Sequence, residues 1–244
     1  MDQVSALVAG LDNPLVLASG DITFKASERG YEEASQFFDR LRQATQLDRD
    51  RFLFCPGNHD CHAKTHFASF DAFTYGVRRD DACTFAKHSL RSVSIDGLTV
   101  LLLNSAHHLD HSFGLVDEAA VRAIELPSPE NTIAVSHHHV IPTHRNDAST
   151  TRNAYDLLTV LDDKRVPVLL HGHQHLTRGL ATGQTPLHVF GVNSFNFTYP
   201  GGQNAVGVVE WKDENLRFQR RIYVTDGLGA ASGRYHTIDE VIIR

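Results

Sequence analysis

Residues 15–60 read LVLASGDITFKASERGYEEASQFFDRLRQATQLDRDRFLFCPGNHD, and they contain the clearest pattern of local structure in the chain. The stretch begins and ends with short apolar runs, 15–18 and 51–55, and a glycine-containing loop follows each run. Between the two runs, residues 31–47 place apolar side chains at intervals of three and four, which predicts a helix with one buried face. A strand, a helix and a second strand in this order predict a parallel crossover unit.

The rest of the chain continues this α/β pattern, with strands dominating the last third. Further strands are predicted at 85–89, 91–95, 98–104, 132–136, 166–170, 187–192, 205–211 and 216–224, with a hairpin turn at 96–97 and helices at 117–126 and 153–161. We expect two mixed sheets packed face to face with helices on the outside. A single domain is expected over 1–244, with 226–244 as a C-terminal extension that forms a loosely attached strand.

The composition is that of a soluble globular protein, with 41% hydrophobic and 21% charged residues. No run approaches the roughly 18 apolar residues of a membrane span, and no secretory signal is recognisable, so no membrane partner is expected. Three cysteines, Cys55, Cys61 and Cys83, fit a reducing compartment, and the predicted location is cytoplasmic. The net charge of −6 argues against sequence-independent binding of a nucleic-acid backbone.

The unusual feature of the composition is histidine, of which the chain has 16 residues. Histidine is the most common metal ligand in proteins and is rarely accumulated for packing alone. Four segments place an oxygen or imidazole ligand where an apolar strand passes into a loop: Gly20-Asp21, Gly57-Asn58-His59-Asp60, His137-His138-His139 and Gly172-His173-Gln174-His175. Sites in α/β layers collect at the carboxyl ends of strands, so we expect these segments to converge on a site for two divalent metal ions.

In this order the segments resemble the calcineurin-like metallophosphoesterase superfamily, whose pattern runs D-x-H, G-D, G-N-H-(D/E), H and G-H-x-H. The likeness covers residues 15–176 and points to the bacterial phosphodiesterase-like branch. It implies a four-layer αββα sandwich with a dinuclear centre of Mn²⁺, Fe²⁺ or Zn²⁺. On this sequence the implied metal ligands are Asp21, Asn58, His137, His173 and His175, and the implied catalytic residue is His59.

The resemblance also implies roles for these side chains. Asp21 would bridge the two metals, and a hydroxide held between them would attack phosphorus. A protonated His59 would stabilise charge on the phosphoryl and departing oxygens. Contacts with substrate or with the ligands are expected for Asp60, His139, His171 and His108. Two alternatives stay open: His139 could replace His137 as the ligand, and His108 could be a solvated loop residue like His107 and His111.

Two positions depart from the family pattern. The D-x-H motif supplies two ligands of the first metal, and nothing upstream of Asp21 can replace it. The first strand of the fold is therefore expected to be missing, through truncation, a wrong start codon or real loss. Phe24 stands where many relatives carry an aspartate that orients the catalytic histidine, which favours phosphodiesters over phosphomonoesters.

The sequence therefore predicts metal-dependent hydrolysis of a small-molecule or nucleotide phosphoester. A catalytically impaired metal-binding or scaffold module is one alternative, because the first motif is missing. A nuclease is another, since it would use the same metals, although it needs a basic groove. The sequence does not indicate an oligomeric state.

Overall fold

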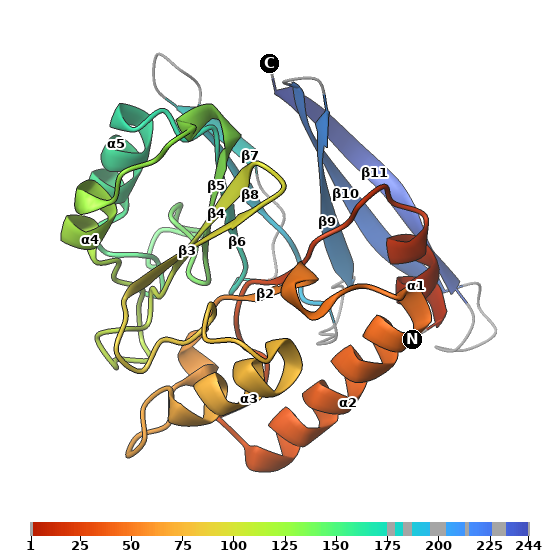
Figure 1. Ribbon diagram of the computed structural model, residues 1–244. Helices are drawn as coiled ribbons and strands as arrows, with labels where there is room; N and C mark the ends of the chain where they lie inside the picture. Colours follow the sequence, from red (N-terminus) through yellow and green to blue (C-terminus); the bar gives the residue numbers. More distant parts are fainter. Residues whose placement is uncertain are drawn as a thin grey trace.

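The computed structural model of the protein describes residues 2–174, 179–182, 187–195, 204–212, 215–225 and 233–243. Its main sheet has six strands in the order β3-β4-β5-β6-β8-β7 (Figure 1). These are β3 (Leu90–Ile95), β4 (Leu98–Leu103), β5 (Thr132–Ser136), β6 (Val168–His171), β8 (Leu187–Gly191) and β7 (Gly179–Thr182). The four strands β4, β5, β6 and β8 run parallel, whereas β3 and β7 are antiparallel to their neighbours.

The second sheet layer is divided into two parts. Strand β1 (Val16–Ala18) pairs in parallel with β2 (Phe52–Phe54), as the crossover pattern predicts. The other part is an antiparallel sheet of β9 (Ala205–Lys212), β10 (Asn215–Thr225) and β11 (Gly233–Ile243). Strand β11 pairs with β10 over the stretch 216–225, with a shift of register between Arg220 and Arg221.

Alternating side chains of the main sheet build two cores. In β4, Val100 and Leu102 face the core shared with β2, whereas Leu101 and Leu103 face the opposite side. That opposite face is covered by α4 (Glu118–Ala123) and α5 (Ala154–Asp163). A strand buried on both faces reads as a continuous apolar run, which is how 98–103 appears in the sequence.

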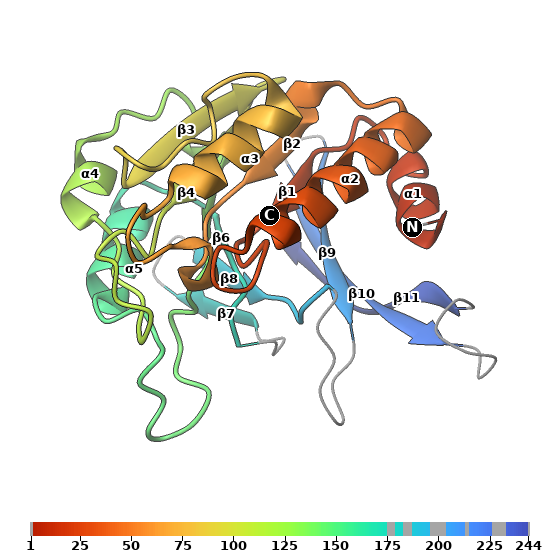
Figure 2. The ribbon, with the colours of Figure 1, turned by 90° about the horizontal axis from the view of Figure 1, so that it is seen from below.

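The remaining helices lie on the side of the second layer. They are α1 (Asp2–Ala9), α2 (Glu28–Thr45) and α3 (Ala68–Arg78). Helix α2 begins after Ser27, whose side chain accepts a hydrogen bond from the backbone N–H of Gly30, and ends at Gln46 in a left-handed conformation. Figure 2 shows α1, α2 and α3 along one side of β1 and β2. No helix in the described part of the chain is long and apolar enough to cross a membrane.

A cleft of about 2110 Å³ separates the two parts of the second layer. Its walls include β1, β9, α2 and the inner face of the main sheet, and they carry apolar side chains such as Leu17, Phe37, Ile133 and Val208. Protein interiors normally contain few voids larger than a water molecule. No strand among the described residues pairs with the free edge of β1.

The structure confirms a mixed α/β fold with helices on the outside, and it corrects three details of the sequence prediction. Residues 85–89 form turns instead of a strand, because the carboxylate of Asp71 accepts hydrogen bonds from the N–H groups of Phe85 and Ala86. Helix α3 and strand β7 were not predicted. Helix α3 begins at Phe67, which makes no capping bond with its side chain, so the start signal was absent from the sequence.

Candidate metal centre

The candidate site begins where β1 ends. The chain turns through Gly20, with a φ of 101°, and Asp21, with a φ of 54°. A Cβ atom on Gly20 would lie 2.5 Å from Nδ1 of His137 and 2.7 Å from the backbone nitrogen of Gly57. Glycine is therefore required here, both for the left-handed backbone and for the close approach of two other loops.

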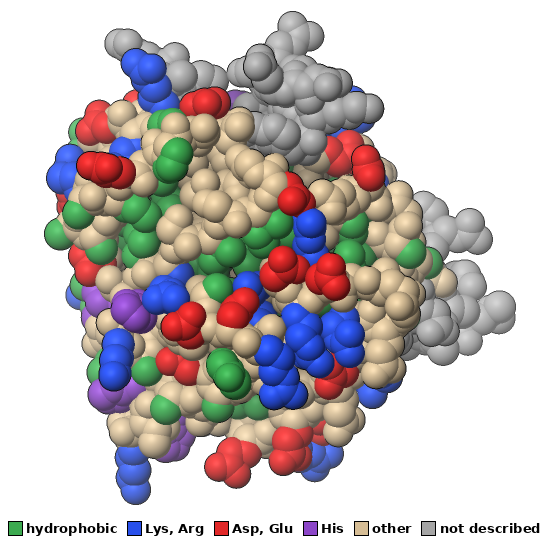
Figure 3. Space-filling model, in the orientation of Figure 1, with side chains coloured by type: hydrophobic (Ala, Val, Ile, Leu, Met, Phe, Trp, Pro, Cys, Tyr) green, Lys and Arg blue, Asp and Glu red, His purple; other side chains and the backbone are tan. Residues whose placement is uncertain are grey.

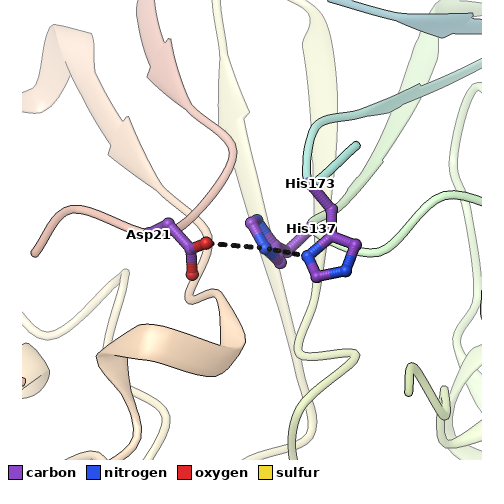
Figure 4. Close-up of side chains that lie close together, drawn as sticks. All are labelled: Asp21, His137 and His173. Carbon is purple, nitrogen blue, oxygen red and sulfur yellow. Dashed lines mark hydrogen bonds and ion pairs between the residues drawn. The ribbon is translucent and has the colours of Figure 1, made fainter. Parts of the chain in front are cut away.

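Three potential ligand atoms meet at the carboxyl ends of β1, β5 and β6. Asp21, His137 and His173 each offer an atom, and these atoms all lie within 4.8 Å of one another. Nε2 of His137 lies 3.2 Å from Oδ2 of Asp21 and 3.0 Å from Nδ1 of His173. Figure 4 shows the carboxylate and the two imidazole rings approaching one another from separate segments of the chain. Two of the three ligands, Asp21 and His173, have a left-handed backbone, and such strain in residues other than glycine concentrates at functional sites.

Hydrogen bonding orients His137 for coordination. Its Nδ1 lies 2.8 Å from the backbone oxygen of Ser19, which can only accept, so Nδ1 carries a proton. In the neutral ring, Nε2 then presents its lone pair to Asp21 and His173. A metal-binding histidine normally donates its second ring N–H in this way.

Electrostatics favours a cation at this point. Burial alone would raise the pKa of the Asp21 carboxyl, but the neighbouring His137 and the backbone N–H of His59 hold it well below its ordinary value. Burial alone would lower the pKa of His137, and the charge of Asp21 outweighs it and raises that pKa. The buried carboxylate thus stabilises positive charge beside it, whether a proton or a metal ion carries that charge.

The buried side-chain oxygen of Asn58 suits a metal ligand. Its side chain is 4% exposed. The Nδ2 group donates to the backbone oxygen of His111 at 3.1 Å, whereas Oδ1 is buried without a hydrogen-bond partner among the described residues. A buried amide oxygen without a partner costs on the order of 1–3 kcal/mol, and a coordinated cation would remove this cost. The donor set of one carboxylate, one amide and two imidazoles fits a divalent metal ion.

A family model described as calcineurin-like phosphoesterase matches residues 2–176 of the chain. The chain belongs to this family. This match confirms the resemblance seen in the four motifs. No match was found among curated proteins.

Comparison with solved structures found similar chains. A dimetal phosphatase from Danio rerio is similar with a TM-score of 0.68 and 13% identity, over 99% of this chain and 88% of that one. Vps29 from Chaetomium thermophilum has a TM-score of 0.47 and 11% identity, over 99% of this chain and 88% of that one. At 13% identity, the likeness to the dimetal phosphatase establishes the fold alone and leaves the function to be argued from the site.

His59, which the sequence predicts to be the catalytic residue, lies next to Asp21. Its backbone N–H donates to Oδ1 of Asp21 at 3.0 Å, and its half-buried ring is 4.7 Å from the ring of Phe24. Phe24 is 64% exposed, so the pair lies at the surface of the site. The departure at position 24 thus places an aromatic ring where relatives are expected to have a carboxylate.

Asp60 connects the loop that carries Asp21 with the loop that carries Asn58. Its buried carboxylate accepts hydrogen bonds from the N–H groups of Gly57 at 2.9 Å and Ile22 at 3.3 Å, and from the hydroxyl of Tyr31 at 3.1 Å. Burial and the charge of Asp21 raise its pKa to about 7. These contacts hold the Asp21 loop against the Asn58 loop, and none of them directs the Asp60 carboxylate toward the ligand cluster.

Three other predicted residues lie around the centre at different depths. His139 is buried, with Nε2 2.8 Å from Oδ2 of Asp147 and its ring stacked 5.6 Å from that of His173. His171 ends β6 and packs on Gly191, and burial lowers its pKa to about 4. His108 lies 4.5 Å from the ring of Phe113. The remaining predicted ligand, His175, lies outside the described residues.

Two further histidines make contacts at the site: His138, for which the sequence predicts no role of its own, and His111, for which the sequence favours a solvated loop position. His138 is fully buried, 4.6 Å from the ring of His173, with Nδ1 2.8 Å from Oγ of Ser105. His111 contacts Asn58 through two hydrogen bonds. Both histidines contact residues that are far apart from them in the sequence. The frequent use of histidine at metal sites is the one signal in the sequence that suggests these contacts.

Proposed function

We propose that this protein hydrolyses a phosphoester with the help of divalent metal ions, and that phosphodiesters are its preferred substrates. The observation that carries the proposal is the convergence of Asp21, His137 and His173, to which the neighbouring loop adds Asn58 with a buried side-chain oxygen that has no hydrogen-bond partner among the described residues. Membership of the calcineurin-like family and the fold of a dimetal phosphatase support the same reaction class.

In this proposal, different residues bind the metal ions and donate the proton. Asp21, Asn58, His137 and His173 would hold one dication, and the carboxylate of Asp21 would be shared with a second one. Bound dications supply positive charge for the phosphoryl oxygens and lower the pKa of water. His59 lies at the open side of the cluster, where its ring can donate a proton to the departing oxygen.

The preference for diesters rests on the surroundings of His59. Its ring contacts Phe24 rather than a carboxylate. A monoester dianion brings more negative charge to the site than a diester, and an apolar exposed ring offers no compensation for it. The same ring can contact the second ester group of a small-molecule or nucleotide diester.

The direct test is hydrolysis of model substrates by the purified protein with Mn²⁺. We expect cleavage of bis-p-nitrophenyl phosphate to exceed that of p-nitrophenyl phosphate, and we expect Asp21→Ala to abolish both. Asp39→Ala, on the outer part of α2, is the matched control and should keep full activity. Absence of cleavage of both substrates by the wild-type protein would contradict the proposal.

A metal-binding or scaffold module is the second candidate, and one observation favours it. Within the described ranges, histidine and acidic side chains gather at metal-binding distance in one place only, at Asp21, His137 and His173. This part of the chain therefore supplies one clear set of ligands. Metal analysis separates the candidates: about two dications per chain support the enzyme, and one or none supports the module.

A nuclease is less well supported by the charge distribution. On the face shown in Figure 3, lysine and arginine side chains are interspersed with aspartate and glutamate. The net charge of −6 points the same way. Binding to a polyanionic backbone requires a basic surface that displaces counterions.

A further inference from the structure

The loop between β4 and α4, residues 104–114, reaches across to the candidate metal centre. It carries His107, His108 and His111. His111 and Asn58 form a reciprocal pair: Nδ1 of His111 lies 2.6 Å from the backbone oxygen of Asn58, and Nδ2 of Asn58 donates to the backbone oxygen of His111 at 3.1 Å. The two residues are 53 positions apart, so the pair joins two separate loops.

This pair fixes the orientation of the Asn58 side-chain amide. A backbone oxygen can only accept, so the His111 oxygen selects the NH₂ end of the amide. The other end, Oδ1, is left buried and without a partner among the described residues. The ring of His111 meanwhile donates its Nδ1 proton to the backbone of Asn58. His111 therefore holds both the side chain and the backbone of Asn58, each through one hydrogen bond.

The loop that presents His111 is itself braced. At its start, the side chain of Asn104 accepts a hydrogen bond from the N–H of Ala106 at 3.0 Å. Near its end, the guanidinium of Arg152 lies 3.4 Å above the ring of Phe113. Support at both ends limits the positions available to His111, as an orienting contact requires.

We propose that His111 is a positioning residue that sets the affinity of the metal centre by orienting Asn58. The inference rests on the proposed metal site and adds a residue that acts through a ligand without being one. Residues that orient metal ligands typically change metal affinity by about 10–100-fold when they are replaced. His111→Ala should therefore weaken binding of Mn²⁺ by a factor in that range.

The test measures the dissociation constant for Mn²⁺ by isothermal titration calorimetry on the metal-free full chain. His111→Asn keeps an N–H donor near the position of Nδ1 and should bind within about threefold of the wild type. His107→Ala is the matched control from the same loop, because the ring of His107 bonds to the backbone oxygen of Asn104 within that loop. It should bind Mn²⁺ like the wild type, and circular dichroism would verify that each variant is folded.

A double-mutant cycle shows whether His111 acts through Asn58. In an Asn58→Ala background, His111→Ala should have no further effect on the Mn²⁺ dissociation constant. Wild-type affinity of His111→Ala would overturn the inference while leaving the metal site intact. An equal loss in both backgrounds would also overturn it, because His111 would then act independently of Asn58. A wild-type protein that binds no Mn²⁺ would instead contradict the proposed function.

Discussion

His59 contacts Asp21 through its backbone and leaves its side chain for a different role. Oδ1 of Asp21 accepts its hydrogen bond from the backbone N–H of His59, not from the imidazole. The ring lies against Phe24, which is exposed at the surface. Metal binding and proton donation are thus assigned to different atoms of one short segment.

This separation predicts the behaviour of His59→Ala. The variant keeps the backbone N–H, so its affinity for Mn²⁺ should equal that of the wild type. Loss of the imidazole should lower kcat for bis-p-nitrophenyl phosphate by about 100-fold or more, the usual contribution of a general acid. Calorimetry and steady-state kinetics measure the two quantities. If the variant kept full kcat, His59 would have no part in proton transfer.

The ligand residues themselves were largely accessible to sequence reasoning. Asp21, Asn58, His137 and His173 each follow closely after an apolar strand, and parallel strands bring such positions to one edge. The role of His111 was not accessible, because its loop carries no periodic pattern and its partner is 53 residues away. Contacts of this kind depend on how a loop folds back, which local sequence patterns do not specify.

At the level of elements, the loop after β5 is stabilised by one buried carboxylate. Both oxygens of Asp147 are used: Oδ2 accepts from the N–H and the hydroxyl of Thr143 and lies 2.8 Å from Nε2 of His139, and Oδ1 accepts from the N–H and the hydroxyl of Ser149. Burial alone would raise the pKa of Asp147, but these hydrogen bonds hold it well below its ordinary value. The loop follows the His137 ligand directly, so Asp147 stabilises the backbone next to the site.

The lowered pKa gives a prediction with a definite sign. A group with a depressed folded-state pKa contributes stability above its unfolded pKa of about 3.9, and this contribution is lost as the pH falls toward the folded value. Asp147→Asn should therefore be less stable than the wild type by about 1–3 kcal/mol at pH 7. Urea unfolding at pH 7 and pH 3.5 should show a smaller difference at the lower pH. A difference that stayed constant would show that the charge of Asp147 is not involved.

Prediction of the elements succeeded where packing and local pattern agree. Helix α2 and strands β4, β5 and β6 have apolar positions that match their buried faces. It failed at 85–89, where the carboxylate of Asp71 accepts hydrogen bonds from the backbone N–H groups of Phe85 and Ala86. A side chain that satisfies two backbone N–H groups competes with strand pairing, and its partners cannot be identified from the local sequence.

At the scale of the whole molecule, the cleft between β1 and β9 is the main departure from a closed sandwich. Its volume of about 2110 Å³ exceeds the roughly 300–1,000 Å³ of typical ligand pockets. Helix α1 packs beside α2 and leads into β1, which is the position of a crossover helix. A parallel strand preceding α1 would complete a second crossover unit and pair with the free edge of β1.

We predict that such a strand stabilises the protein. A variant extended before α1 by five to seven apolar residues and a short turn should have a Tm higher by several degrees, because each side chain that becomes fully buried contributes about 1.5–3 kcal/mol, offset in part by ordering entropy. An extension of glycine and serine of equal length is the control and should leave the Tm unchanged. Equal Tm values for both extensions would show that the cleft does not accept a strand.

The carboxyl end of β1 leads to Asp21, so the architecture of the second layer and the composition of the metal centre are linked. Any strand parallel to β1 in the cleft would also end at this edge of the sheet. The whole account depends on the four side chains of Asp21, Asn58, His137 and His173 acting together on one dication.

The most direct test is a crystal structure of the protein grown with Mn²⁺, with anomalous scattering used to locate the metal. We predict a peak coordinated by a carboxylate oxygen of Asp21, Oδ1 of Asn58, Nε2 of His137 and a ring nitrogen of His173, each about 2.0–2.4 Å from the ion. A map without a peak at this position, or with the Asn58 oxygen turned away from it, would contradict the account.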